Sequence, residues 1–362
     1  MSPVEALIRD RIKSTGPISV ADFMELALGH PDHGYYMTGD PFGVSGDFIT
    51  SPEISQVFGE LIGLWAAVTW QQMGSPECLV LVECGPGRGT LMKYVLRAAK
   101  SVPDFHQAIE IHLVENSPAM RRRQQDTLTG FTLSWHDSIA TVPAGPIILI
   151  ANEFLDALPI HQFVMTDNGW TERCIDVVAD SLTFVTAEAP PNHLPALPSD
   201  APPGAVFERC PVAMEFADTL SHRLAATPGA ALIIDYGHGK SAIGETLQAA
   251  HQHAFCDPLS NPGNADLTAH VDFGAFAHQL SSGGATTSGP VTQSAFLGGI
   301  GIRERTQQLL KTASPEARAD VMSATVRLTD PVQMGELFKV MVATSPEMPR
   351  LAGFESWAEE TC

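Results

Sequence analysis

A chain of 362 residues, 44% of them hydrophobic, can bury one large core and a second smaller one, which predicts a globular protein of one elaborated domain or two. The formal net charge of −20 argues against binding to nucleic acids or anionic membranes, because such binding depends on clustered lysine and arginine. A basic peptide or a guanidinium group would instead be attracted by this charge.

Two helices are predicted at the N-terminus. Ser2 begins a capping-box pattern ahead of apolar residues at helical spacing, and Ser19 begins a second one. Residues 29–52 form a turn-rich stretch that we expect to be either a packed loop over a site or a structural Ω-loop without ligand contacts. Thr50 and Ser51 in this stretch are candidate cofactor contacts. A helix over residues 54–73 leads to the first core strand.

Residues 79–91 join a buried-strand pattern to a glycine-rich turn and a helix. Glycines at every second position let the backbone turn sharply and approach a ligand closely. A dinucleotide fingerprint would need its third glycine at position 90, where Thr90 stands, whereas an acidic residue followed by three alternate glycines fits the chain. This spacing favours S-adenosylmethionine over NAD. The candidate cofactor contacts of the turn are Glu83, Gly85, Pro86, Gly87 and Gly89.

The next two predicted strands supply further cofactor contacts. The apolar run 109–114 ends at Glu115, where a doubly wound sheet places a carboxylate that accepts hydrogen bonds from a ribose diol. The interval from the glycine turn is longer than the usual one of about 20 residues, and a loop at 103–106 accounts for the excess. A short strand over 131–135 precedes Asp137, which either contacts an adenine or caps the next turn.

The fourth apolar run, 146–151, delivers Asn152, Glu153 and Asp156 at its end, where a doubly wound sheet positions polar residues for chemistry. An antiparallel insertion follows. Strands over 162–166 and 170–175 flank an Asp-Asn-Gly hairpin turn, residues 182–185 supply another strand, and the proline-rich stretch 190–203 is a loop.

The remaining patterns complete an α/β fold with a seven-stranded, doubly wound sheet. The predicted elements are a helix over 212–225, a strand over 230–237, a helix over 273–280, a strand over 286–292, helices between 303 and 325 and a strand over 337–343. We expect four regions: N-terminal helices and site-covering loop 1–75, cofactor-binding half 76–159, antiparallel β insertion 160–210, and second half of the core 211–362.

Cysteine spacing and the N-terminal residues bear on metal binding and location. The six cysteines include no C-x-x-C pair and no metal-ligand spacing, so we expect a reducing compartment and no metal. The N-terminus carries Glu5 and Asp10 and lacks an apolar stretch, unlike a signal or transit peptide. No run approaches the roughly 20 apolar residues of a membrane span. These features predict a cytoplasmic protein.

Several ordered motifs resemble one known family over nearly the whole chain. They are His33-Gly34-Tyr35-Tyr36, residues 46–53, residues 83–91, residues 152–159, Ile234-Asp235-Tyr236-Gly237 and residues 266–273. The chain resembles the MidA-like S-adenosylmethionine-dependent methyltransferases, which include the mitochondrial complex I assembly factor that methylates a protein arginine. Leu155 stands where the family often has a second Phe, and Glu245 interrupts a Gly-Thr-Leu motif. The resemblance implies a class I methyltransferase (Rossmann-like) fold, S-adenosylmethionine as cofactor and a protein-arginine substrate, such as a respiratory complex I subunit.

Methyl transfer to a guanidinium requires carboxylates that orient its planar fork and stabilise developing charge. Asn152, Glu153 and Asp156 are the catalytic candidates, and Asp47 and Glu53 from the N-terminal loop form a second tier. In the alternative interpretation Asn152 caps a following helix whose dipole the two carboxylates complement. A non-catalytic assembly chaperone and an NAD-dependent oxidoreductase are the alternative functions.

Overall fold

The computed structural model describes residues 1–38, 50–187 and 197–355, and the chain divides into two compact units. The first comprises Met1–Phe48, Asp156–Glu215 and Lys240–His270, and the second comprises Ile49–Leu155, Phe216–Gly239 and Val271–Cys362. Each unit has its own hydrophobic core. Neither unit is one continuous stretch of chain, so segments distant in sequence must pair before either core can form.

The second unit is built on the sheet β15-β16-β10-β5-β2-β3-β4, with the short β14 beside β10. The strands are β2 Leu79–Cys84, β3 Ile109–Val114, β4 Leu133–His136, β5 Ile147–Asn152, β10 Gly229–His238, β14 Val271–Asp272, β15 Thr286–Thr292 and β16 Phe338–Thr344. β16 runs antiparallel to both of its neighbours, and the strands from β10 to β4 are mutually parallel. The doubly wound sheet and its seven predicted strands are confirmed, and the short β14 is an eighth strand that was not predicted. The strand order reverses between β2 and β5, which is where such sheets bind ligands.

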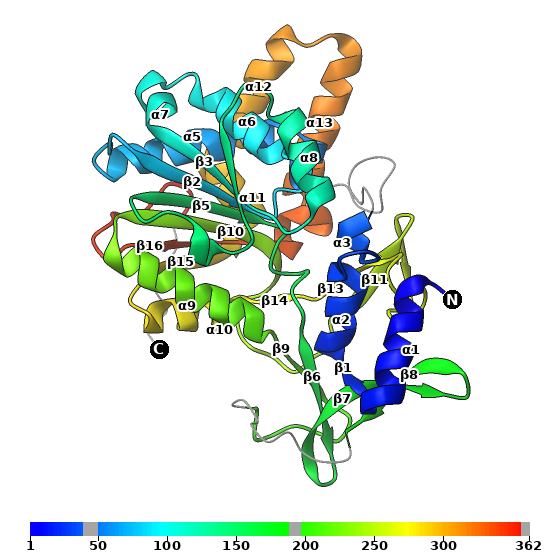
Figure 1. Ribbon diagram of the computed structural model, residues 1–362. Helices are drawn as coiled ribbons and strands as arrows, with labels where there is room; N and C mark the ends of the chain where they lie inside the picture. Colours follow the sequence, from blue (N-terminus) through cyan, green and yellow to red (C-terminus); the bar gives the residue numbers. More distant parts are fainter. Residues whose placement is uncertain (39–49, 188–196, 356–362) are drawn as a thin grey trace. The chain divides into compact units, whose positions relative to one another are not determined.

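Helices cover both faces of this sheet: Figure 1 shows α5 and α6 on one side and α9 and α10 on the other. The helices are α4 Ser51–Ile54, α5 Gln56–Gln72, α6 Thr90–Ala99, α7 Pro103–Ala108, α8 Pro118–Thr127, α9 Pro211–Ala226, α10 Phe273–Ser282, α11 Gln293–Gly299, α12 Ile302–Thr312 and α13 Pro315–Thr329, with the short helical turns η1 Ile139–Thr141 and η2 Pro331–Gly335. Within the described ranges, no helix is long and apolar enough to cross a membrane.

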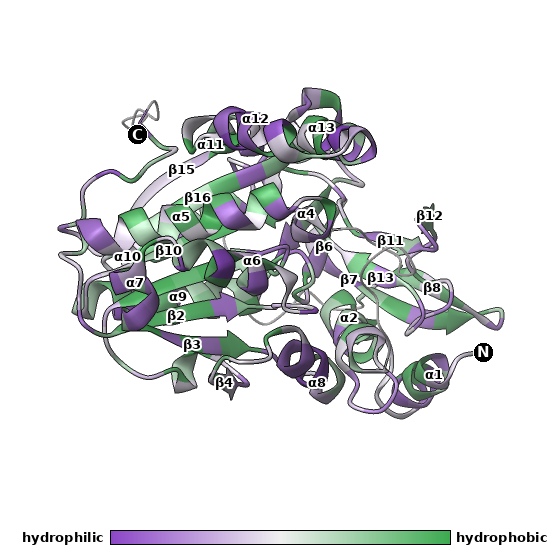
Figure 2. Cartoon of the chain, turned by 90° about the horizontal axis from the view of Figure 1, so that it is seen from above, coloured by the Kyte–Doolittle hydropathy of each residue, from purple (hydrophilic) through white to green (hydrophobic). Residues whose placement is uncertain are grey.

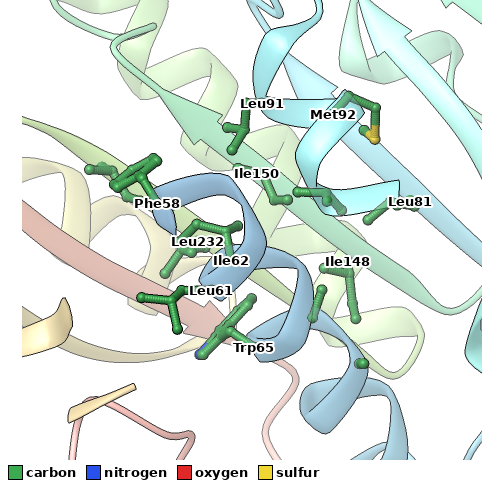
Figure 3. Packing of buried hydrophobic residues seen from close by; sticks show 14 of the residues in the cluster. Phe58, Leu61, Ile62, Trp65, Leu81, Leu91, Met92, Ile148, Ile150 and Leu232 are labelled. Carbon is green, nitrogen blue, oxygen red and sulfur yellow. The ribbon is translucent and has the colours of Figure 1, made fainter. Parts of the chain in front are cut away.

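The core of the second unit lies between α5, α6 and the central strands. Figure 3 shows Ile62 of α5 beside Leu232 of the sheet, and Phe58, Trp65 and Ile148 belong to the same cluster. Every residue of β2 and β5 is buried, and in Figure 2 the central strands are largely green while α8 is largely purple. Parallel strands covered on both faces read as continuous apolar runs. This is why the sequence pattern located them.

In its described residues, the first unit contains two antiparallel sheets and the helices α1, α2 and α3. Its elements are α1 Pro3–Thr15, β1 Ile18–Ser19, α2 Val20–Gly29, α3 Tyr35–Thr38, β6 His161–Thr166, β7 Gly169–Val178, β8 Ser181–Thr186, β9 Val206–Arg209, β11 Gln248–His251, β12 Ala254–Cys256 and β13 Asp266–Thr268. One sheet has the order β1-β7-β6-β9 with β8 beside β7, and the other has the order β12-β11-β13. The predicted hairpin is β6–β7, and Gly169 supplies its left-handed residue at φ 101°.

One local prediction is wrong: the loop expected at 103–106 is the short helix α7. The helix expected over 54–73 is confirmed as α5, and the separate short helix α4 precedes it. The two helices are divided at Ser55, whose backbone is extended and whose hydroxyl accepts the Val57 N–H as the cap of α5. A serine can lie inside a helix or at its N-cap, and hydrophobic spacing does not show which of these two positions it occupies.

Candidate active site

The glycine turn connects β2 to α6 through three left-handed residues. The φ angles are 62° at Gly85, 51° at Gly87 and 80° at Gly89, a region that side chains with a Cβ rarely adopt. A Cβ on Gly85 would lie 2.9 Å from Cδ2 of Phe154. The Gly89 N–H donates to the Pro86 carbonyl at 2.7 Å and closes the turn. The turn therefore presents bare backbone at the point where the strand order of the sheet reverses.

Glu83 is buried at the end of β2, with 3% of its surface exposed. Its pKa is raised to about 8, mainly by burial and to a smaller extent by the charge of Glu115, while a hydrogen bond from the Met92 backbone lowers it. Its Oε2 atom is buried and has no hydrogen-bond partner among the described residues. A buried acceptor without a partner costs free energy, so a donor on a bound ligand would stabilise this group.

Glu115 directly follows β3, and hydrogen-bond donors hold both of its carboxylate oxygens. Its Oε1 accepts the Ser117 N–H at 2.8 Å, and its Oε2 accepts Nε2 of Gln124 at 3.0 Å. Burial raises the pKa of this carboxyl, while these hydrogen bonds lower it. The two oxygens of a carboxylate together accept about four hydrogen bonds, so Glu115 can still accept a hydrogen bond from a ligand diol.

Asp137 is exposed and forms an ion pair with Arg121 of α8 at 2.5 Å. The cap of the following turn is Ser138, whose Oγ accepts the Ala140 N–H. The described contacts thus give Asp137 a partner on α8 rather than a capping role, and its contact with an adenine stays a prediction.

At the end of β5, Glu153 has a left-handed backbone with φ 51°. Its Oε1 accepts the Ser51 N–H at 2.9 Å and Nδ2 of Asn152 at 3.0 Å. Left-handed φ in a residue with a long side chain is strained, and such strain clusters at functional sites. Residues 153–160 form no helix, so the alternative in which Asn152 caps a helix is wrong.

Two further buried atoms near this strand end find no partner among the described residues. They are Oδ1 of Asn152 and Oγ of Ser51. Asn152 is 8% exposed and Ser51 is fully buried. Together with Oε2 of Glu83, they give the second unit three unsatisfied buried oxygens at the carboxyl ends of β2 and β5 and at the start of α4.

Asp235 near the end of β10 shapes the same turn, a role that its sequence motif did not predict. Its Oδ2 accepts the backbone N–H groups of Phe154 at 3.1 Å and Leu155 at 2.9 Å. Asp235 is 1% exposed. An acidic residue directly after five apolar ones in a buried strand is the signal that could have identified it, because buried carboxylates need donors.

The candidates from the N-terminal loop have different outcomes. Glu53 accepts a hydrogen bond from Oγ1 of Thr90, the residue that interrupts the dinucleotide fingerprint. Thr50 is the N-cap residue of α4 but makes no side-chain capping bond. Asp47 lies outside the described residues, so its catalytic role stays a prediction.

Asp156 belongs to the first unit, where it is 6% exposed. The Tyr36 hydroxyl donates to Oδ1 of Asp266 at 2.6 Å. Burial raises the pKa of Tyr36 well above its usual value, and the charges of Asp266 and Asp156 raise it further. Two carboxylates and a phenol are therefore gathered in the first unit. Tyr36 and Asp266 belong to two of the family motifs, but they lie 230 positions apart, so sequence spacing did not predict their pairing.

Comparisons with known proteins agree with this geometry. The model of a family described as S-adenosyl-L-methionine-dependent methyltransferases matches residues 61–291. Protein arginine methyltransferase NDUFAF7, mitochondrial, of Danio rerio is 38% identical over 92% of this chain and 84% of its own length. The protein of the same name from Homo sapiens is 38% identical over 93% of this chain and 83% of its own.

A solved structure is also similar to the whole chain. It is a Burkholderia thailandensis protein bound to S-adenosyl-homocysteine, with a TM-score of 0.86 and 27% identity, covering 99% of this chain and 96% of its own. A likeness over both chains at this score includes both units and not the sheet alone.

The relatives overturn the expected cytoplasmic location, because they are named as mitochondrial proteins. That expectation depended on the residues at the N-terminus. Targeting segments are removed or recognised separately from the fold, so a catalytic fold carries no record of its compartment.

Proposed function

We propose that this chain, which belongs to the family of S-adenosyl-L-methionine-dependent methyltransferases, transfers a methyl group to an arginine side chain of a partner protein. The observation that supports the site best is the set of unsatisfied buried oxygens on Glu83 and Asn152, at the ends of the neighbouring strands β2 and β5. Buried acceptors of this kind suit a ligand that brings its own donors.

The residues present fit S-adenosylmethionine. Its amino group can donate to Oε2 of Glu83, its ribose diol can donate to the two oxygens of Glu115, and the glycine turn admits its close approach. Contacts with Thr50, Ser51 and Asp137 complete the proposed cofactor site. When bound, this cofactor would supply a methyl group on a positively charged sulfur. The sulfur is the leaving group when a nucleophile in line with the carbon–sulfur bond takes the methyl group.

Glu153 is the proposed partner of the acceptor guanidinium. Two donors hold its Oε1, so its second oxygen and its negative charge have a defined direction. A fixed carboxylate orients a guanidinium and stabilises the charge that develops as a nitrogen attacks. Oδ1 of Asn152 is a second acceptor for its N–H groups. Asp156 and Asp47 stay candidates for the same role.

The partner protein is proposed from charge and family. The net charge of −20 favours a basic polypeptide, and relatives at 38% identity are named protein arginine methyltransferase. On the resemblance to the complex I assembly factor, we propose a subunit of respiratory complex I as the substrate.

The test is to incubate lysate of a strain lacking this protein with the purified enzyme and labelled S-adenosylmethionine, and then to identify the labelled residue by mass spectrometry. We expect label on an arginine of one or a few proteins, and none with a Gly87→Val variant. Label on another residue type would refute the arginine assignment. S-adenosylhomocysteine binding without transfer to any protein would favour the non-catalytic chaperone.

A further inference from the structure

The side chain of Gln124 joins three separate parts of the second unit. Gln124 lies on α8 and is fully buried. Its Nε2 donates to the Gly87 carbonyl at 2.8 Å and to Oε2 of Glu115 at 3.0 Å, and its Oε1 accepts Nε1–H of Trp135 on β4 at 2.8 Å. One amide therefore connects the glycine turn, the ribose candidate and the neighbouring strand.

The orientation of this amide follows from its partners. The indole N–H of Trp135 can only donate, and the Gly87 carbonyl can only accept. The amide oxygen must therefore face Trp135, and the amide nitrogen must face Gly87 and Glu115. The amide nitrogen thus makes two hydrogen bonds and the amide oxygen makes one. No other common side chain of this length offers two donors and an acceptor in this arrangement.

The backbone of α8 also lies close to the turn. A Cβ on Gly89 would be 3.6 Å from Cα of Gln124 and 3.5 Å from the Leu128 side chain. The amide thus spans a short and fixed interval. The glycine turn and Glu115 are on different loops, and Gln124 is hydrogen-bonded to both.

We infer that Gln124 is a positioning residue for the cofactor, which sets the distance between the glycine turn and the carboxylate that binds the ribose. Gln124 leaves the outer acceptor direction of Glu115 available and prevents this carboxylate from rotating. The inference depends on the proposed role of Gly87 and Glu115 in cofactor binding.

The sharpest variant is Gln124→Glu, which keeps the shape of the side chain. It replaces a donor by an acceptor against the Gly87 carbonyl and Glu115. Other charged groups near this point are Glu83, whose charge is coupled to Glu115, and Arg121, which donates to the Glu115 carbonyl. At low pH a proton shared by the two carboxyls can restore the hydrogen bond, and at higher pH, where both carboxyls are ionised, the pair repels.

We expect Gln124→Glu to weaken S-adenosylhomocysteine binding about tenfold or more at pH 8, with partial recovery near pH 6. The KM for S-adenosylmethionine should rise in proportion while kcat at saturation changes less than about threefold. Gln125→Glu, which places the same charge at the exposed neighbouring position of α8, should bind within about twofold of wild type. Gln124→Met, which loses the hydrogen bonds and keeps the length, should lose affinity without the recovery at low pH.

Wild-type affinity of folded Gln124→Glu at pH 8 would overturn the inference, as would a loss of melting temperature with affinity unchanged. Gly87→Val and Glu115→Gln are measured in the same binding assay, so that failure of the proposed cofactor site can be distinguished from failure of the Gln124 inference. If these two variants bind normally, the cofactor site and the Gln124 inference both fail. If they lose affinity and the Gln124 variants do not, only the inference fails.

Discussion

The parallel strands β2 and β5 are neighbours in the sheet, and the chain takes a left-handed backbone after each of them, but with different residue types. After β2 the chain takes left-handed φ angles at three glycines, and Glu83 is left with an unsatisfied buried oxygen. After β5 the left-handed residue is Glu153 itself, and its carboxylate is held by two donors. One strand end has bare backbone and an unsatisfied acid, and the other has a strained backbone and a fixed acid.

The difference separates binding from chemistry. A turn without Cβ atoms admits a ligand close to its backbone, and an unsatisfied acceptor gains a partner only when that ligand arrives. A carboxylate held in place before the ligand arrives can stabilise developing charge without reorganising. We therefore expect changes after β2 to alter affinity for the cofactor and changes after β5 to alter turnover.

The largest effect is expected for Gly87→Val. A branched side chain at this left-handed position would occupy the space where the ligand meets the backbone, so affinity for S-adenosylhomocysteine should fall on the order of 100-fold or more. Gly74→Val is the matched control, because Gly74 has φ 85° and nothing within 4 Å of its added Cβ. It carries similar backbone strain without blocking a ligand. Equal affinity of Gly87→Val and wild type by calorimetry would refute the site.

Glu153→Gln tests the other strand end. The amide oxygen can still accept the Ser51 N–H and the Asn152 amide, so the substitution removes the charge and retains both hydrogen bonds. The rate constant of methyl transfer under single-turnover conditions should fall about 100-fold, while the affinity for S-adenosylmethionine changes little. Glu153→Gly, which relieves the backbone strain and removes the carboxyl, should be as inactive. Wild-type turnover of Glu153→Gln would show that the carboxylate charge has no catalytic role.

Glu83 should make stability depend on pH. Its pKa of about 8 in the fold exceeds the ordinary value of 4.5, so the folded protein binds more protons between these values. Its contribution to stability is therefore fully present below about pH 4.5 and is lost as pH rises to about 8. Relative to wild type, the free energy of unfolding of Glu83→Gln should increase progressively between about pH 5.5 and about pH 8.5, by up to a few kcal/mol. Its melting temperature should rise accordingly.

Saturating S-adenosylhomocysteine should reduce this difference, because the ligand supplies the missing donor. A gap between the two melting curves that stays constant with pH would contradict the buried, proton-binding state of Glu83.

Glu115→Gln should weaken S-adenosylhomocysteine binding about tenfold, since the amide loses charge and turns its NH2 group toward either the Ser117 N–H or the Gln124 amide. The control is Glu110→Gln on the same strand, whose carboxylate is exposed. Equal affinity of Glu115→Gln and wild type would exclude Glu115 as the ribose contact.

The smallest effect is expected for Asp137→Asn. An exposed ion pair such as that of Asp137 with Arg121 contributes about 0–1 kcal/mol to stability. Cofactor affinity should change less than about threefold if Asp137 reaches adenine only at the surface. A loss of tenfold or more in titrations would move Asp137 into the central cofactor site.

The sequence by itself determined the core strands, the glycine turn and the order of the α/β elements. Buried parallel strands must be apolar along their whole length, and a left-handed turn beside a ligand requires glycine. Both demands are local, so they appear in consecutive residues. The family motifs also predicted S-adenosylmethionine as the cofactor.

Only the tertiary structure decided what each polar residue contacts. Asn152 and Glu153 fit a helix cap as well as a catalytic pair until the chain after β5 proved to be a turn held by Asp235, 82 positions beyond Glu153. Gln124 reads as one polar residue on a hydrophilic helix, and its three partners lie on other elements. Hydrogen-bond partners of buried polar groups are set by which segments meet in space, and that information is not contained in local sequence periodicity.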